Sequence, residues 1–199
     1  MLQSEIVSIV VKIKDRLKFI YFEYLQRYGK PQGYFTYKPE YHSDELPCEI
    51  LVFYWQSLEE KPKTHFATLG MSSQPMEDGQ IAELRLSVHG VFEGDDILAF
   101  SRFLANFTMY PFLHDFAVDW WNIIIDVGQV PVYPDSSALF VHPEPSETGN
   151  GDIAMGDQTI KLFNIIPLTT EESEMVQEEG VVSLLDYLEQ NGIDMLQIR

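Results

Sequence analysis

Residues 81–89, Ile-Ala-Glu-Leu-Arg-Leu-Ser-Val-His, are the stretch of this chain that most clearly indicates its fold. Apolar and polar side chains alternate along it, with Ala82, Leu84, Leu86 and Val88 set against Glu83, Arg85 and Ser87. Because successive side chains of a strand point to opposite faces, this pattern predicts a strand with one covered face and one face in water. A strand of that kind is typical of an antiparallel sheet.

Further strands are indicated on both sides of this stretch. Residues 48–55 are apolar on both faces, residues 64–71 are mixed, and residues 160–166 again resemble a strand. Residues 118–141 indicate short strands around a turn at 128–134. The sequence therefore predicts a mixed, largely antiparallel sheet.

One long loop is expected between the last two of these stretches. Residues 143–157 contain the tract Gly-Asn-Gly-Asp at 149–152, and these residue types favour turns over regular structure. We expect the whole of this stretch to be an exposed loop.

Two helices are expected to cover the sheet. Residues 4–28 carry apolar side chains at spacings of three and four, and Gly29 is placed to end the helix that this spacing predicts. A second amphipathic helix is expected over residues 97–107, with Asp95 or Asp96 as its N-terminal cap.

Shorter helices are expected near the end of the sequence. Thr169 and Glu172 have the spacing of a capping box, and residues 181–188 form a last apolar stripe. Taken together, the elements predict an α+β fold with a long N-terminal helix. We expect a single domain, in which residues 1–30 form an amphipathic helix packed on the domain of residues 31–199.

Acidic residues outnumber basic ones, and the resulting net charge of −18 arises entirely from residues 64–199. Residues 1–63 hold nine Lys or Arg and nine Asp or Glu, whereas residues 64–199 hold four basic and 22 acidic residues. Direct binding of nucleic acid is disfavoured, because affinity for phosphate comes from basic side chains. A basic protein partner is the natural electrostatic complement, and solubility alone is an equally simple reason for the charge.

The sequence also indicates a compartment. Its apolar runs fall far short of the roughly 20 residues that a membrane span needs, and charged residues interrupt the N-terminal apolar pattern. The single cysteine, Cys48, lies in an apolar stretch and is expected to be a buried small hydrophobic residue. We expect a cytoplasmic protein with no membrane segment.

Sequence motifs for catalysis and for cofactor binding are missing. The chain has no Gly-x-Ser-x-Gly motif and no glycine-rich phosphate loop between a strand and a helix. Its five histidines, which are His42, His65, His89, His114 and His142, do not have the spacing of metal ligands. We therefore expect no enzyme active site, no metal and no cofactor.

Two other hypotheses about the function of this chain stay open. Asp119 and Asp126 lie near aromatic residues, so a small hydrolase or ligand-binding enzyme that uses these carboxylates is an alternative to a binding protein. A structural module whose first helix drives oligomerisation is a further one. The pattern leaves the oligomeric state undetermined.

The pair Trp120 and Trp121 stands out from the general aromatic content. In a strand, neighbouring side chains point to opposite faces, so both indoles are buried only if both faces are covered. We expect one of the two to line a groove or a contact surface, where aromatic residues are enriched. Packing in the core is the competing expectation for the other.

Several segments in one order resemble the suppressor of fused-like (SUFU) domain family. The stretch Phe-Ala-Thr-Leu-Gly-Met-Ser at 66–72 resembles its aromatic strand and turn, and residues 82–86 resemble its Glu-Leu strand. Residues 98–107 and 160–172 resemble its helix and its strand leading to Pro-Leu-Thr-Thr-Glu-Glu, and residues 181–188 resemble its closing helix. The resemblance spans residues 46–190.

The resemblance implies a non-enzymatic domain that binds other proteins. Animal members of the family hold a transcription factor by clasping an extended peptide between this domain and a second one, for which the chain is too short. Bacterial members that stand alone resemble immunity proteins of polymorphic toxin systems. The resemblance therefore implies an antitoxin-like inhibitor of a basic toxin domain, with Phe66 and Asp78 at its contact positions. Trp120 and Trp121 join them from the aromatic argument.

Overall fold

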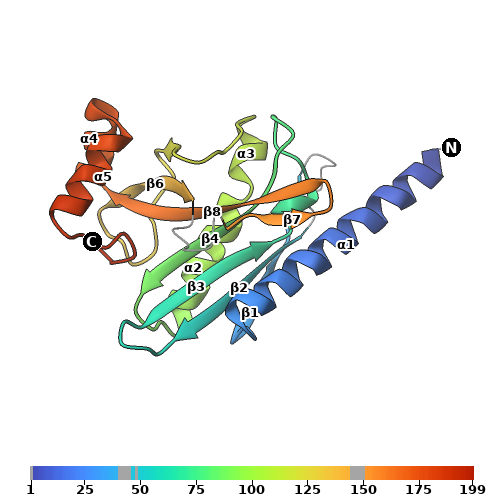
Figure 1. Cartoon of the computed structure of the whole chain (residues 1–199), viewed down its shortest axis with the longest axis horizontal. Helices are drawn as coiled ribbons and strands as arrows, with labels where there is room; N and C mark the ends of the chain where they lie inside the picture. The colour runs from blue at the N-terminus through green and yellow to red at the C-terminus, as the bar shows by residue number, and fades with distance from the viewer. Residues whose placement is uncertain (1, 40–45, 48, 144–150) are drawn as a thin grey trace.

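Strands and helices occur in mixed order along the chain (Figure 1). The computed structural model describes residues 2–39, 46–47, 49–143 and 151–199, with the backbone alone at residues 2–13 and 137. The strands are β1 (Gly33–Tyr37), β2 (Ile50–Ser57), β3 (Lys63–Leu69), β4 (Ile81–His89), β5 (Ile123–Ile124), β6 (Ser136–Pro143), β7 (Ile153–Met155) and β8 (Gln158–Thr169). The helices are α1 (Leu2–Tyr28), α2 (Gly94–Phe107), α3 (Tyr110–Leu113), α4 (Thr170–Glu179) and α5 (Val181–Gln190), with a short 3-10 turn, η1 (Met71–Ser73).

All the strands join one mixed sheet. Their order is β1-β2-β3-β4-β8-β6-β5, and β7 pairs with β8 beside this path. Neighbouring strands are antiparallel except β4 and β8, which run parallel and align Ile81 with Ile160. The predicted α+β fold, with a mixed, largely antiparallel sheet and a long N-terminal helix, is confirmed.

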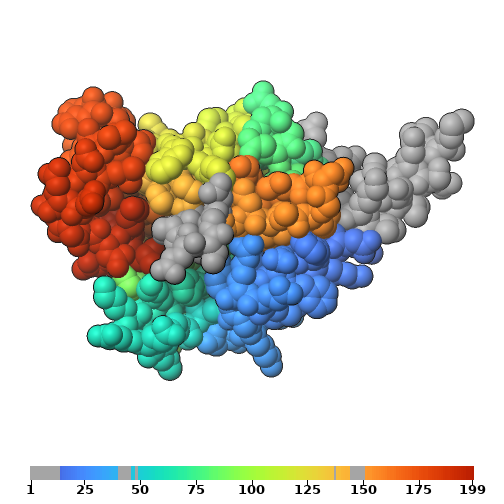
Figure 2. Space-filling view, viewed as in Figure 1, coloured from blue at the N-terminus to red at the C-terminus, as the bar shows by residue number. Residues whose placement is uncertain are grey.

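Helices α1 and α2 cover opposite faces of the sheet. Phe100 of α2 packs in the cluster that contains Leu84 of β4. On the other face, Tyr24 of α1 packs in the cluster that contains Trp55 of β2, and Figure 2 shows α1 lying against the β7–β8 hairpin. Helices α4 and α5 pack on β6 and β8 in a third cluster. The three clusters leave both faces of the central strands covered.

The prediction that β4 has one face in water is wrong. Its apolar row packs under α2, as expected, but Glu83 and Arg85 are also buried on the opposite face. The covering element on that side is α1, where Tyr28 accepts a hydrogen bond from Arg85. Strand β4 is also not purely antiparallel, because it pairs in parallel with β8.

Two strands were not predicted. Strand β1 pairs with β2 at the end of the sheet. Strand β7 lies within the stretch 143–157, so the expectation of an exposed loop throughout is wrong there: Ile153 is buried and faces Ile160 of β8. His42, Cys48 and the Gly-Asn pair at 149–150 lie outside the described residues.

The predicted capping box at the start of α4 is confirmed. The hydroxyl of Thr169 accepts the backbone N–H of Glu172 at 3.2 Å, and the Glu172 carboxylate accepts the backbone N–H of Thr169 at 2.9 Å. The same carboxylate lies 2.8 Å from Nε of Arg199. A buried ion pair thus ties residue 199 to the start of α4.

Candidate binding surfaces

Glu83 is the most completely buried charged group of the described residues, and it organises the turn after β3. Its Oε1 accepts the backbone N–H groups of Gly70 at 2.8 Å and Ser72 at 3.1 Å, and the Ser72 hydroxyl at 2.7 Å. Its Oε2 accepts the hydroxyl of Thr68 at 2.7 Å. Burial raises the pKa of Glu83, and these hydrogen bonds oppose the rise. Its acceptor sites are filled by the chain itself, so the carboxylate has a structural role.

Phe66 and Asp78, the contact residues implied by the resemblance, lie in different environments. Phe66 is 1% exposed and belongs to the core under α2, and its strand β3 is paired on both sides, with β2 and β4. The Phe66 side chain is therefore not accessible at the surface. Asp78 is exposed in the turn before β4, where its Oδ1 accepts the backbone N–H of Gln80 at 2.9 Å. Asp78 is thus accessible to a partner.

Trp120 and Trp121 occupy a turn, so the argument from strand geometry does not apply to them. Trp121 has a φ of 72°, and its backbone N–H donates to the carbonyl of Val141 at 2.7 Å. Its indole is 46% exposed and meets the ring of His142 edge to face at 5.2 Å. Trp120 is half-buried, with Nζ of Lys161 3.7 Å from its ring centroid. One indole is therefore accessible and the other is held by a cation–π contact.

The chain segment that contains Trp121 is acidic and apolar, although Lys161 of β8 lies over the neighbouring Trp120 ring. We call residues 110–129 the acidic aromatic segment; it lies at the surface in Figure 2 (yellow-green, top). Its exposed large apolar side chains are Leu113, Phe116, Trp121 and Ile125, and its exposed carboxylates are Asp115, Asp119 and Asp126. The sequence has no Lys or Arg anywhere between Arg102 and Lys161. This uninterrupted absence of cations is visible in the sequence alone and already indicates an acidic surface.

A hollow of about 430 Å³ opens in this segment. It is lined by aromatic and polar residues, among them Phe103, Tyr110, His114 and Asp126. Asp119 does not line it: the Asp119 carboxylate instead accepts the backbone N–H of Trp120 at 2.8 Å. The two carboxylates of the enzyme hypothesis therefore do not share this hollow. Among the described residues, no group of His, Cys, Asp and Glu is arranged to hold a metal ion.

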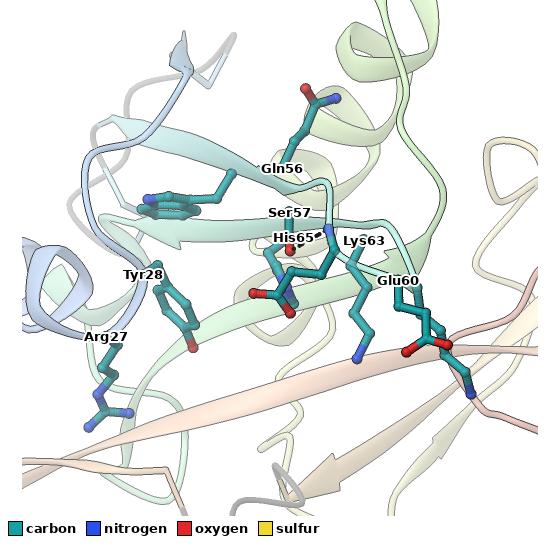
Figure 3. A pocket seen from close by; sticks show the side chains of 10 residues that line it. Arg27, Tyr28, Gln56, Ser57, Glu60, Lys63 and His65 are labelled. Carbon is teal, nitrogen blue, oxygen red and sulfur yellow. Dashed lines mark hydrogen bonds between the residues drawn. The ribbon is translucent and has the colours of Figure 1, made fainter.

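A second hollow, a cleft of about 570 Å³, lies between the end of α1 and the β2–β3 hairpin (Figure 3). Arg27 and Tyr28 of α1 stand on one side, and Glu60 and Lys63 of the hairpin stand on the other. His65 lies between them, with its ring stacked on that of Tyr28 at 6.0 Å. Sequence analysis did not find this cleft, because its residues come from segments far apart in the chain.

Helix α1 gives no indication of a membrane segment. Across the described residues, no helix combines the length and the apolar character that crossing a bilayer requires.

Comparisons with known proteins agree with the fold. The family model for suppressor of fused protein (SUFU) matches residues 44–199. The crystal structure of a SUFU homologue from Neisseria gonorrhoeae aligns with a TM-score of 0.65 and 16% identity, covering 94% of this chain and 95% of that one. A Sufu–Fu complex structure aligns with a TM-score of 0.57 and 13% identity, covering 92% of this chain and 84% of the other.

Drosophila Suppressor of Fused aligns with a TM-score of 0.57 and 14% identity, covering 90% of this chain. The present chain spans 46% of that longer one. A search of curated proteins finds no match.

Proposed function

This chain belongs to the suppressor of fused family, and we propose that it works by binding another protein, without catalysis. The Sufu–Fu structure, a complex, has the same fold and supports a binding role. The hollow at Asp126 lacks the second carboxylate that the enzyme hypothesis placed beside it, so the geometry gives that alternative no support.

The proposed contact surface is the acidic aromatic segment. The observation that carries the proposal is the exposed indole of Trp121, held in a left-handed turn beside exposed carboxylates and without a neighbouring Lys or Arg in the sequence. Indole rings anchor protein interfaces through their large apolar area, and carboxylates attract a basic partner over longer distances. Asp78 and Trp120 are proposed as further contact positions.

The backbone of this segment offers a second means of recognition. Strand β5 lies at one end of the sheet and, among the described strands, pairs only with β6. An extended peptide can add to such an edge by main-chain hydrogen bonds. Trp121 and Ile125 flank β5 and would then contact the side chains of the added strand.

The proposed partner is a basic protein, and the proposed role is that of an immunity or antitoxin-like inhibitor acting in the cytoplasm. An acidic inhibitor would cover a basic toxin domain and be drawn to it electrostatically. We further propose that residues 1–30 and 31–199 act as one unit, because Ile20 and Tyr24 of α1 are fully buried against the sheet.

Capture from lysate with the protein and its Trp121→Ala variant tests this function. We expect the native chain to retain proteins of basic composition and the Trp121→Ala variant to lose them. We also expect the rate of association to fall steeply as the salt concentration rises. Capture that is indifferent to both salt and Trp121 would refute the proposed surface.

A further inference from the structure

The cleft at the end of α1 concentrates basic residues in a protein whose net charge is −18. Arg27, Lys61 and Lys63 line it, and Arg85 lies beside its wall, where the guanidinium donates to the hydroxyl of Tyr28. Three of the chain's 13 Lys and Arg therefore line this cleft, whereas Arg85 is 3% exposed and lies behind its wall. The lining contrasts with the acidic aromatic segment, whose sequence has no Lys or Arg. Glu59 and Glu60 are the acidic residues of the lining, and both belong to the hairpin.

Arg27 forms a fixed wall of this cleft. Its guanidinium donates to the backbone carbonyls of Gly151 and Asp152, the latter at 3.1 Å, and lies 3.7 Å from the carboxylate of Glu23. A planar guanidinium held by several partners is oriented before any ligand arrives. Its position therefore does not depend on a ligand.

Lys61 and Lys63 are the adaptable donors on the opposite wall. The ion pairs found among the described residues include neither lysine. An ammonium group on a flexible stem can turn toward an anionic ligand and donate up to three hydrogen bonds. Cations thus approach the cleft from both sides.

Aromatic rings form the surface between these walls. The rings of Tyr28 and His65 are stacked at an interplanar angle of 23°. The ring centroids of Trp55 and Tyr28 are 5.3 Å apart. The indole N–H of Trp55 donates to the carbonyl of Gly29 at 2.9 Å, and Nδ1 of His65 lies 2.8 Å from the hydroxyl of Ser87. These hydrogen bonds hold the rings in place, so the cleft is preformed.

We propose that this cleft binds an acidic peptide segment of another protein. Its carboxylates would pair with Lys61 and Lys63, and its apolar side chains would lie on the rings of Tyr28 and His65. A volume of about 570 Å³ is more than a small anion fills and suits several peptide residues. None of these residues belongs to the acidic aromatic segment, so the site is independent of the proposed function.

Selection from a randomised displayed peptide library, with the full chain as bait, tests the proposal. Selected peptides are expected to be rich in Asp and Glu, and an enriched peptide is then labelled with fluorescein and titrated by fluorescence anisotropy. The double variant Lys61→Glu/Lys63→Glu is expected to weaken its binding about tenfold or more at low salt.

Lys18→Glu/Lys38→Glu is the matched control, because it changes the net charge equally at side chains that are 72% and 70% exposed. The control should bind the peptide within about twofold of the native chain, since distant exposed charges are largely screened. Equal weakening by both double variants, selection of basic or uncharged peptides, or no selection would overturn the proposal. Sedimentation could also show that the native chain self-associates and that only Lys61→Glu/Lys63→Glu abolishes this. That result would overturn the proposal, because the cleft would then bind a second copy of this chain.

Discussion

Gly70 passes so close to Glu49 that a Cβ atom at position 70 would lie 2.2 Å from the backbone carbonyl oxygen of Glu49. Gly70 also has a φ of 133°, which other residues rarely adopt. The turn that resembles the family's Gly-Met-Ser motif is therefore closed to any side chain at its first position.

We expect Gly70→Ala to lower the free energy of unfolding by about 3 kcal/mol or more, because backbone strain and a backbone clash add. Gly79→Ala is the matched control: Gly79 has a φ of 82°, but nothing lies within 4 Å of a Cβ built there. Strain alone should cost about 1 kcal/mol at Gly79. Urea denaturation followed by circular dichroism measures both, and equal losses would contradict the clash.

Replacing Glu83 is expected to destabilise the same turn. Glu83→Ala would leave the backbone N–H groups of Gly70 and Ser72 buried without acceptors, a loss of about 3 kcal/mol or more. Glu83→Gln keeps one oxygen and the shape of the side chain, so we expect a smaller loss. The prediction fails if the two variants unfold at the same urea concentration.

The stability contributed by Glu83 should decrease as pH rises. Burial raises the pKa of this carboxyl above its ordinary value of 4.5, so the folded state binds the proton more tightly than the unfolded state. The contribution is complete below pH 4.5 and is lost as pH rises through the raised pKa. The unfolding free energy of the native chain minus that of Glu83→Gln should therefore fall over this window. A difference that grows with pH would show that the hydrogen bonds to Glu83 outweigh its burial.

Trp121 and Trp120 should separate binding from stability. Trp121→Ala is expected to lower the free energy of unfolding by less than about 1 kcal/mol, since the indole is half exposed, and to weaken a complex by about 2 kcal/mol or more. Trp120→Ala should cost more stability, because this ring packs against the core and carries Lys161. Thermal unfolding of both variants and titration with a captured partner measure the two effects.

Local patterns in the sequence were enough to predict the longer elements. Helix α2, strand β4 and the Thr169 capping box each carry several residues of the expected type at the expected spacing. Strand β1 was missed because five residues next to Gly29 and Pro31 give too short an alternation to outweigh the turn signals. Strand β7 has only three residues and follows the glycine-rich tract.

Burial of Glu83 and Arg85 could not be predicted from their own segment. Charged residues that alternate along a strand predict a face exposed to solvent. In this protein α1 packs over that face of β4, so the two charged side chains are buried. The cleft at Arg27 and Lys63 has the same origin, since it forms only when α1 and the β2–β3 hairpin meet. The sequence does, in contrast, predict that one of the two adjacent indoles is exposed, and the exposed indole is that of Trp121.

The parallel pairing of β4 with β8 has a consequence for folding kinetics. Strands β1 to β4 follow one another as antiparallel neighbours, so they can associate through comparatively local contacts. The pair that aligns Ile81 with Ile160 must instead close a loop that contains α2, α3, β5, β6 and β7. Loop closure of this size is entropically costly before any contact offsets it, and sheets with such non-local pairings fold in about milliseconds to seconds. The meander of β1 to β4 would then assemble first, and docking of β8 against it would set the rate at which the native chain appears.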